Sequence, residues 1–124
     1  MPEFLNPSPT FPICDAVITT GRTLETVIVP IPDHADAPVQ GGPAAEMQEI
    51  FRQLDEVLTK ANVTRRSVAS VRLYLAHVNR DIAAVNDVYK EYFANCSPMR
   101  MAVGAELQKG MLIEAQFIVE ITRS

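Results

Sequence analysis

Three polar side chains in the second half of the chain have types suited to holding a small ligand: Asn86, Arg100 and Glu114. Arg100 follows a proline corner at Pro98, and its planar guanidinium can bind a carboxylate through two parallel hydrogen bonds. Glu114 can orient or deprotonate a water molecule. Asn86 lies one position off the apolar stripe of a predicted helix, where it could donate to a ligand across a subunit boundary. The plainer alternative is an exposed asparagine, a solvated glutamate and a surface or interface arginine paired with an acid.

The stretch from Ile82 to Glu120 contains the elements that must position these residues. Its last part, Leu112–Ile121, alternates between apolar and polar side chains, which is typical of a strand with one buried face. We therefore predict a strand over Met111–Ile121, with Glu114 on its polar face. If it shares a sheet with the strand that starts near Arg100, the guanidinium and the carboxylate could face one pocket.

Two amphipathic helices are predicted. The first begins at Pro43, which suits a first helical residue because its missing N–H would have no partner there. Glu46 falls outside its apolar stripe. The second opens at Val78-Asn79-Arg80-Asp81 with Asn79 as its N-cap. The apolar stripes consist of Met47, Ile50, Leu54, Val57, Leu58 and Ala61 in the first helix, and Ile82, Val85, Val88, Tyr89, Tyr92 and Phe93 in the second.

The remaining extended segments are rich in β-branched residues or alternate in polarity. They are Cys14–Thr20, Thr23–Val29, Val68–Ala76 and Met101–Ala105. Gly21 lies between the first two, which favours a hairpin turn there. In Val68–Ala76 the alternation places Ala69, Val71, Leu73 and Leu75 on one face.

The element order β-β-α-β-α-β-β predicts an α+β fold, with a single mixed sheet backed by two helices. Residues 1–124 form one domain, in which the proline-rich residues 1–12 are an extended N-terminal segment. The second face of the sheet would carry Arg72, Tyr74, Arg100, Glu114 and Gln116. Such a mixed polar face favours cover by a partner subunit.

Composition limits the partners. The chain has 124 residues, a net charge of −4 and no basic stripe, so we expect no nucleic acid. It has no signal-peptide pattern and no apolar run of about 20 residues, so we expect a cytoplasmic protein with no membrane contact. Cys14 and Cys96 are expected as reduced thiols, and neither His34 nor His77 has a second ligand at metal spacing. No cofactor or metal is predicted.

Three motifs carry a family resemblance: Ala84-Val-Asn-Asp-Val-Tyr-Lys-Glu-Tyr-Phe93, Pro98-Met-Arg100 and Leu112-Ile-Glu-Ala-Gln116. Together they resemble the Rid family of reactive-intermediate deaminases (YjgF-like proteins), over about Gly41 to Ile121. The resemblance implies a chorismate-mutase-like fold and a homotrimer with ligand clefts at its interfaces. It also implies hydrolysis of an imine or enamine acid to a 2-oxo acid and ammonia, without a cofactor.

The resemblance also assigns roles. Arg100 matches the arginine that grips the substrate carboxylate, and Glu114 matches the glutamate that holds the attacking water, with a one-residue deletion between them. Asn86 matches the asparagine of a Val-Asn-x-x-Tyr motif.

The N-terminal half departs from the family pattern. Ile13 or Cys14 stands where the family has a pocket tyrosine, and Val27–Pro32 replaces a Ser-Gly-Gln-Ile-Pro stretch. Met99 and Met101 flank the arginine in place of smaller residues. The predicted substrate-binding residues are therefore Ile13, Cys14, Val27, Asn86 and Arg100, around a more apolar pocket with an altered substrate.

Three functions compete at this point. The first is deamination of a reactive enamine or imine acid in a subunit-interface cleft. The second is a non-catalytic trimer that binds a small carboxylate metabolite and regulates a partner, for which Arg100 suffices without Glu114. The third is an endoribonuclease, which the acidic charge disfavours.

Overall fold

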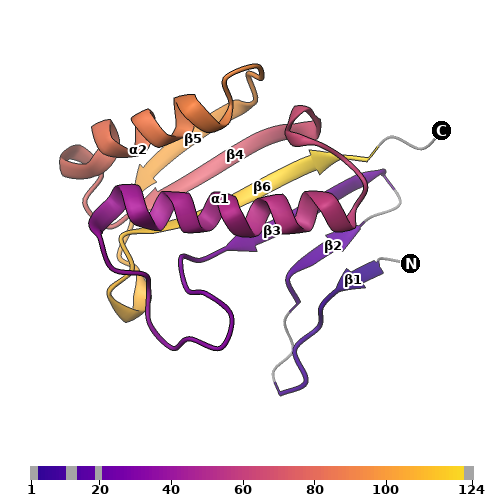
Figure 1. The fold of residues 1–124 in the computed structure, drawn as a ribbon, viewed down its shortest axis with the longest axis horizontal. Helices are drawn as coiled ribbons and strands as arrows, with labels where there is room; N and C mark the ends of the chain where they lie inside the picture. Colours follow the sequence, from indigo (N-terminus) through magenta and orange to yellow (C-terminus); the bar gives the residue numbers. More distant parts are fainter. Residues whose placement is uncertain (1–2, 11–13, 19–20, 122–124) are drawn as a thin grey trace.

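One six-stranded sheet with two helices on one of its faces forms the fold (Figure 1). The computed structural model describes residues 3–10, 14–18 and 21–121. The elements in chain order are β1 (Glu3–Leu5), β2 (Ala16–Ile18), β3 (Thr23–Ile28), α1 (Gly42–Lys60), β4 (Val68–Leu75), α2 (Val78–Tyr92), β5 (Met99–Gly104) and β6 (Ile113–Glu120). Short 3₁₀ turns occupy Arg65–Ser67 and Gln108–Gly110. The predicted α+β class with two helices over a mixed sheet is confirmed.

The N-terminal segment contains a strand that the prediction left out. β1 pairs antiparallel with β2, and the Asp15 amide donates to the Leu5 carbonyl at 2.9 Å just beyond it. The true order is therefore β-β-β-α-β-α-β-β. Pro7 and Pro9 fall in the loop that follows β1, and β1 lies at the sheet edge, where one side needs no ladder partner.

The strand order is β1-β2-β3-β6-β4-β5, so β6 lies between β3 and β4. Neighbouring strands are antiparallel except β4 and β5, which are parallel. The chain crosses from β4 to β5 through α2. β5 is consequently an edge strand, and β4 separates it from β6. This order decides where the predicted site residues lie.

A β-bulge changes the face pattern at the start of β4. The register shifts between Val68 and Ser70, leaving Ala69 exposed, whereas Val68 and Ser70 are buried. The prediction that Ala69 shares a face with Val71, Leu73 and Leu75 is therefore wrong, since Ala69 is exposed and the other three are buried. The extra residue of a bulge displaces the alternation locally.

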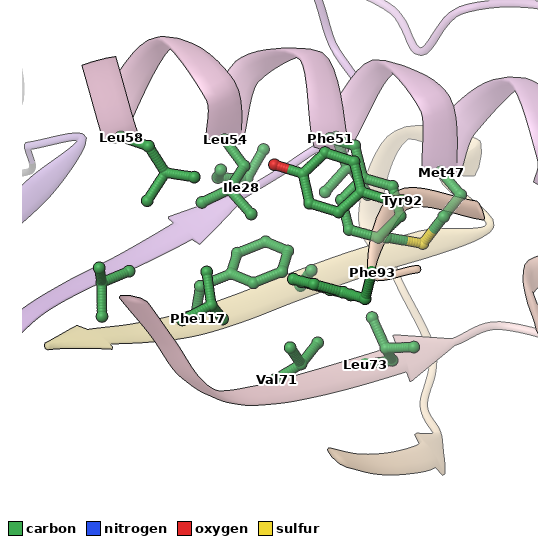
Figure 2. Close-up of a cluster of buried hydrophobic side chains, with 14 of the residues drawn as sticks. Ile28, Met47, Phe51, Leu54, Leu58, Val71, Leu73, Tyr92, Phe93 and Phe117 are labelled. Atoms are coloured by element: carbon green, nitrogen blue, oxygen red, sulfur yellow. The ribbon is translucent and has the colours of Figure 1, made fainter. Parts of the chain in front are cut away.

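The core lies between the helices and the inner face of the sheet (Figure 2). Phe51 of α1 stacks on Tyr92 of α2, with ring centroids 3.9 Å apart, and both lie above Phe117 of β6. The Tyr92 hydroxyl donates to Asp55 of α1 at 2.5 Å, which ties the two helices together. The fully buried large side chains include Leu24, Met47, Ile50, Leu54, Leu73, Ile113, Val85 and Phe117.

The helix starts agree only in part with the prediction. Pro43 lies in the first turn of α1 as predicted, after Gly41. Gly41 has a φ of 119°, and a Cβ there would lie 2.8 Å from the Ala45 Cβ, so glycine is required. The predicted Asn79 cap of α2 is wrong, because α2 begins at Val78 after His77 and no side chain caps it.

Glu46 is buried, contrary to the prediction, with 3% of its surface exposed. Its carboxylate accepts hydrogen bonds from the Leu112 amide at 2.8 Å and the Ile113 amide at 3.2 Å. Glu46 thus attaches α1 to the start of β6 and satisfies two backbone donors. Burial raises the pKa of the Glu46 carboxyl, an effect opposed by these two amides and increased by the nearby Asp81 charge.

Neither helix combines the length and the apolar character that a membrane span needs, within the part of the chain that the structure describes.

From the raised pKa of the Glu46 carboxyl we predict a pH-dependent difference in stability between wild type and Glu46→Gln. Because its pKa in the folded protein is raised above the ordinary 4.5, the folded protein binds more protons than the unfolded chain between these two values. Its contribution to the free energy of unfolding therefore increases as the pH falls through the folded pKa. The free energy of unfolding of Glu46→Gln, relative to that of wild type, should be highest at pH 7 and should fall towards pH 4.5. Urea unfolding across this range measures the difference, and a pH-independent difference would contradict the assignment.

Candidate functional site

Arg100 is held on the helix side of the sheet by two residues of α2. Its Nη1 donates to Asn86 Oδ1 at 2.6 Å, and its guanidinium carbon lies 4.9 Å from the centroid of the Tyr89 ring. Asn86 and Tyr89 are three residues apart on a helix, so their side chains lie on the same face. We call Asn86, Tyr89 and Arg100 the arginine clamp. The amide and the aromatic ring orient the guanidinium without neutralising its charge.

No carboxylate pairs with Arg100 among the described residues, where the ion pairs involve Arg52, Arg65 and Arg80. Arg100 lines a surface hollow of about 540 Å³ at the end of α2 and the start of β5. The other residues that line it are Tyr89, Lys90, Phe93, Ala94, Cys96, Ser97 and Pro98. Since none of these is acidic, the arginine is available to bind an anion.

The Tyr89 hydroxyl is buried without a hydrogen-bond partner among the described residues. Burial raises the pKa of Tyr89, and the Arg100 charge partly offsets this effect. Tyr89 is therefore a neutral phenol whose useful group is its ring face. In the sequence Tyr89 belongs to the apolar stripe of the second helix, and its spacing of three residues from Asn86 is a signal for a shared face.

Glu114 lies on the opposite face of the sheet. It alternates with the buried Ile113 and Ala115 and pairs across the ladder with Tyr74. Arg100 instead pairs with Val71, whose side chain faces the helices. The predicted placement of Arg100 on the same face as Glu114 is therefore wrong.

The two residues are also far apart along the sheet. Val71 pairs with both Arg100 and Phe117, so Arg100 is level with Phe117. Glu114 is three residues further along β6, and β4 lies between β6 and β5, which separates the Cα atoms of Arg100 and Glu114 by roughly 14 Å. A single chain does not direct this guanidinium and this carboxylate into one pocket.

The other predicted binding residues do not gather at one site. Asn86 joins Arg100, whereas Val27 lies on the Glu114 face, 54% exposed and paired with Gln116. The Cys14 thiol, which precedes β2, donates to the Ala16 carbonyl at 3.3 Å. Ile13 lies outside the described residues.

Met99 and Met101 also lie on the face away from the helices. They pair with Ser70 and Arg72, and they are 72% and 47% exposed. In one chain they consequently do not surround the Arg100 guanidinium, although they are its sequence neighbours.

The described residues contain no group of three or more His, Cys, Asp or Glu side chains arranged to hold a metal ion. The arrangement at Arg100 can bind an anion by charge and hydrogen bonding.

A family model described as Endoribonuclease L-PSP matches residues 7–121 of the chain. A RutC family protein of Pyrococcus abyssi is 29% identical over 113 residues, which covers 90% of this chain and 88% of the relative. A 2-iminobutanoate/2-iminopropanoate deaminase of Dermatophagoides farinae is 34% identical over 101 residues, or 81% of this chain and 69% of the relative. The goat deaminase of the same name is 37% identical over 81 residues, where the match spans 64% of this chain and 58% of the relative.

Solved structures share the fold. YyfA of Yersinia pestis, a protein of unknown function from the conserved Rid family, superimposes with a TM-score of 0.87 at 25% identity, over 98% of this chain and all of that one. Yeast Mmf1 superimposes with a TM-score of 0.83 at 21% identity, over 96% of this chain and 94% of that one.

From the buried Tyr89 hydroxyl, which has no hydrogen-bond partner among the described residues, we predict the effect of two substitutions. Tyr89→Phe keeps the ring under Arg100 and removes an unsatisfied buried group, so the free energy of unfolding should stay equal or rise by up to about 1 kcal/mol. Tyr89→Leu removes the ring face and should weaken anion binding at Arg100, measured by calorimetry with a small carboxylate. A destabilising Tyr89→Phe would show that the hydroxyl has a partner.

Proposed function

Because the chain belongs to the Rid (YjgF-like) family, we propose that it hydrolyses an imine or enamine acid to a 2-oxo acid and ammonia. The observation that carries this proposal is Arg100, a clamped guanidinium with no acidic partner among the described residues, beside a hollow without carboxylates. The relatives named as 2-iminobutanoate/2-iminopropanoate deaminases add support.

In the proposed reaction, Arg100 binds the substrate carboxylate through two parallel hydrogen bonds, and Glu114 orients a water molecule. The water oxygen adds to the imine carbon while the C=N electron pair moves to nitrogen. Glu114 accepts a proton from the water and returns it to the nitrogen. The carbinolamine formed in this way passes its hydroxyl proton to the nitrogen through Glu114, the C–N bond breaks with its electron pair on nitrogen, ammonia leaves and the carbonyl forms. Positioning and one cation suffice, since holding the reactants in place removes much of the barrier.

The two groups act on one substrate only if they come from two chains. Arg100 and Glu114 point to opposite faces of one sheet and lie too far apart, as described above. We therefore infer that each site forms between copies of the chain in a homotrimer, with the arginine clamp from one copy and Glu114 with Val27 from the next.

The uncovered face of the sheet favours this assembly. Its exposed large apolar side chains are Phe4, Val27, Met99 and Met101. One row across the sheet reads Val27, Gln116, Arg72, Met101, which combines apolar contact area with a charge. A second copy is the occupant that this mixed composition suits.

Imine hydrolysis tests the reaction. An amino-acid oxidase would generate imines in the presence of semicarbazide, and the fall in trapped semicarbazone would report hydrolysis. Arg100→Ala should lower kcat/KM at least tenfold through loss of a charge-assisted pair, and Glu114→Ala should lower kcat.

The result also separates the alternatives. If no imine is hydrolysed faster, the deaminase proposal fails. Carboxylate binding that survives Glu114→Ala without any hydrolysis would support a regulatory binding trimer instead. RNA cleavage that is unaffected by both substitutions would point to a contaminating nuclease.

The proposed assembly predicts the mass in solution. Sedimentation equilibrium should give three times the chain mass of 13.7 kDa. Met101→Asp adds a charge to the uncovered face and should shift the protein towards monomers without unfolding it, since Met101 is 47% exposed. Ala83→Asp, at an exposed position of α2, is the matched control and should leave the mass unchanged. A monomeric wild type would contradict the assembly.

A further inference from the structure

A second cation lies next to the arginine clamp. Lys90 follows Asn86 by one helical turn on α2, so the two side chains share a helix face. Lys90 and Arg100 both line the hollow of about 540 Å³. Two cations from two different elements therefore face one space.

These cations have no acidic partner among the described residues. None of the ion pairs found there involves Lys90 or Arg100. Asp87 and Glu91 are near Lys90 in sequence, but neither lines the hollow. Four other hollows in the described part of the chain are each lined by at least one carboxylate.

The sign of the charge is unusual for this chain. With a net charge of −4, the protein as a whole repels anions, and this hollow is a local exception. A ligand with a single carboxylate would satisfy Arg100 and leave the Lys90 ammonium without a partner. A ligand with two carboxylates would pair with both.

The rest of the lining suits a short carbon chain between the two anionic groups. Phe93, Pro98 and the Tyr89 ring are apolar surfaces, and Ser97 adds one hydroxyl. We propose that Lys90 is a specificity residue that selects imino acids with a second, side-chain carboxylate. This inference rests on the proposed deaminase function and names its substrate class.

The kinetic test compares imines made by oxidases from aspartate and glutamate with the imine made from alanine. In wild type, kcat/KM should be higher for the dicarboxylic imines. Lys90→Met should lower that preference roughly fivefold, as expected for one solvent-exposed ion pair. Lys90→Arg should keep it. Lys60→Met is the matched control, because Lys60 ends α1 and lines a different hollow. Added salt should reduce the wild-type preference.

An unchanged preference in Lys90→Met, or a wild type that favours the alanine imine, would overturn the inference.

A binding measurement separates this inference from the proposed reaction. Calorimetry with succinate, which has two carboxylates, and propionate, which has one, measures the binding affinity at Lys90 and Arg100 without turnover. Wild type should bind succinate more tightly, and Lys90→Met should bind the two acids about equally. If the protein hydrolyses the alanine imine but binds succinate no better than propionate, the Lys90 inference fails and the deaminase stands. If no imine is hydrolysed but succinate is preferred through Lys90, the deaminase proposal fails, and Lys90 selects dicarboxylates that are bound and not imino acids that are hydrolysed.

Discussion

The burial of one face of β6 is the constraint on which the rest of the structure depends. Ile113, Ala115, Phe117 and Val119 are almost fully buried beneath the two helices, so the alternate residues must point away from them. β6 also lies between β3 and β4, which makes β5 an edge strand. Together these facts place Glu114 on the uncovered face and leave Arg100 at the rim, under α2. The distance between the two residues follows from the register, and a one-residue slip would bury the carboxylate.

The electrostatics of the rim follow from the same arrangement. Arg100 extends from an edge strand to α2, where an amide and an aromatic ring orient it and no carboxylate neutralises it. By contrast, Arg65 forms an ion pair within the fold. Its Nη2 lies 2.9 Å from Asp55 Oδ2, and its guanidinium carbon lies 3.8 Å from the centroid of the Tyr92 ring. Two arginines in similar aromatic surroundings thus differ in charge pairing: Arg65 has an acidic partner, and Arg100 has none among the described residues.

Periodicity predicted the elements whose burial is one-sided and regular. The alternation of β6 and the stripes of both helices needed no long-range information, so α1, α2 and β6 agree with the expectation. The sequence could not reveal features that depend on distant partners. In the sequence Glu46 resembles a solvated helix residue. Only the fold brings the amides of Leu112 and Ile113 within hydrogen-bond distance of its carboxylate. The bulge at Ala69 and the insertion of β6 between β3 and β4 are likewise properties of the assembled sheet. For the same reason the types of Arg100 and Glu114 suggested chemistry, while their separation within one chain remained hidden.

Complementation between inactive variants tests most directly whether the site is built from two copies. Arg100→Ala and Glu114→Ala would each be purified, mixed, unfolded and refolded together, and then assayed for imine hydrolysis. In a homotrimer whose sites take Arg100 from one copy and Glu114 from the next, random assortment restores about a quarter of the sites. If the site is shared between copies, the mixture should regain activity that neither variant has alone. A mixture as inactive as its two components, with mixed trimers shown to be present, would contradict a shared site.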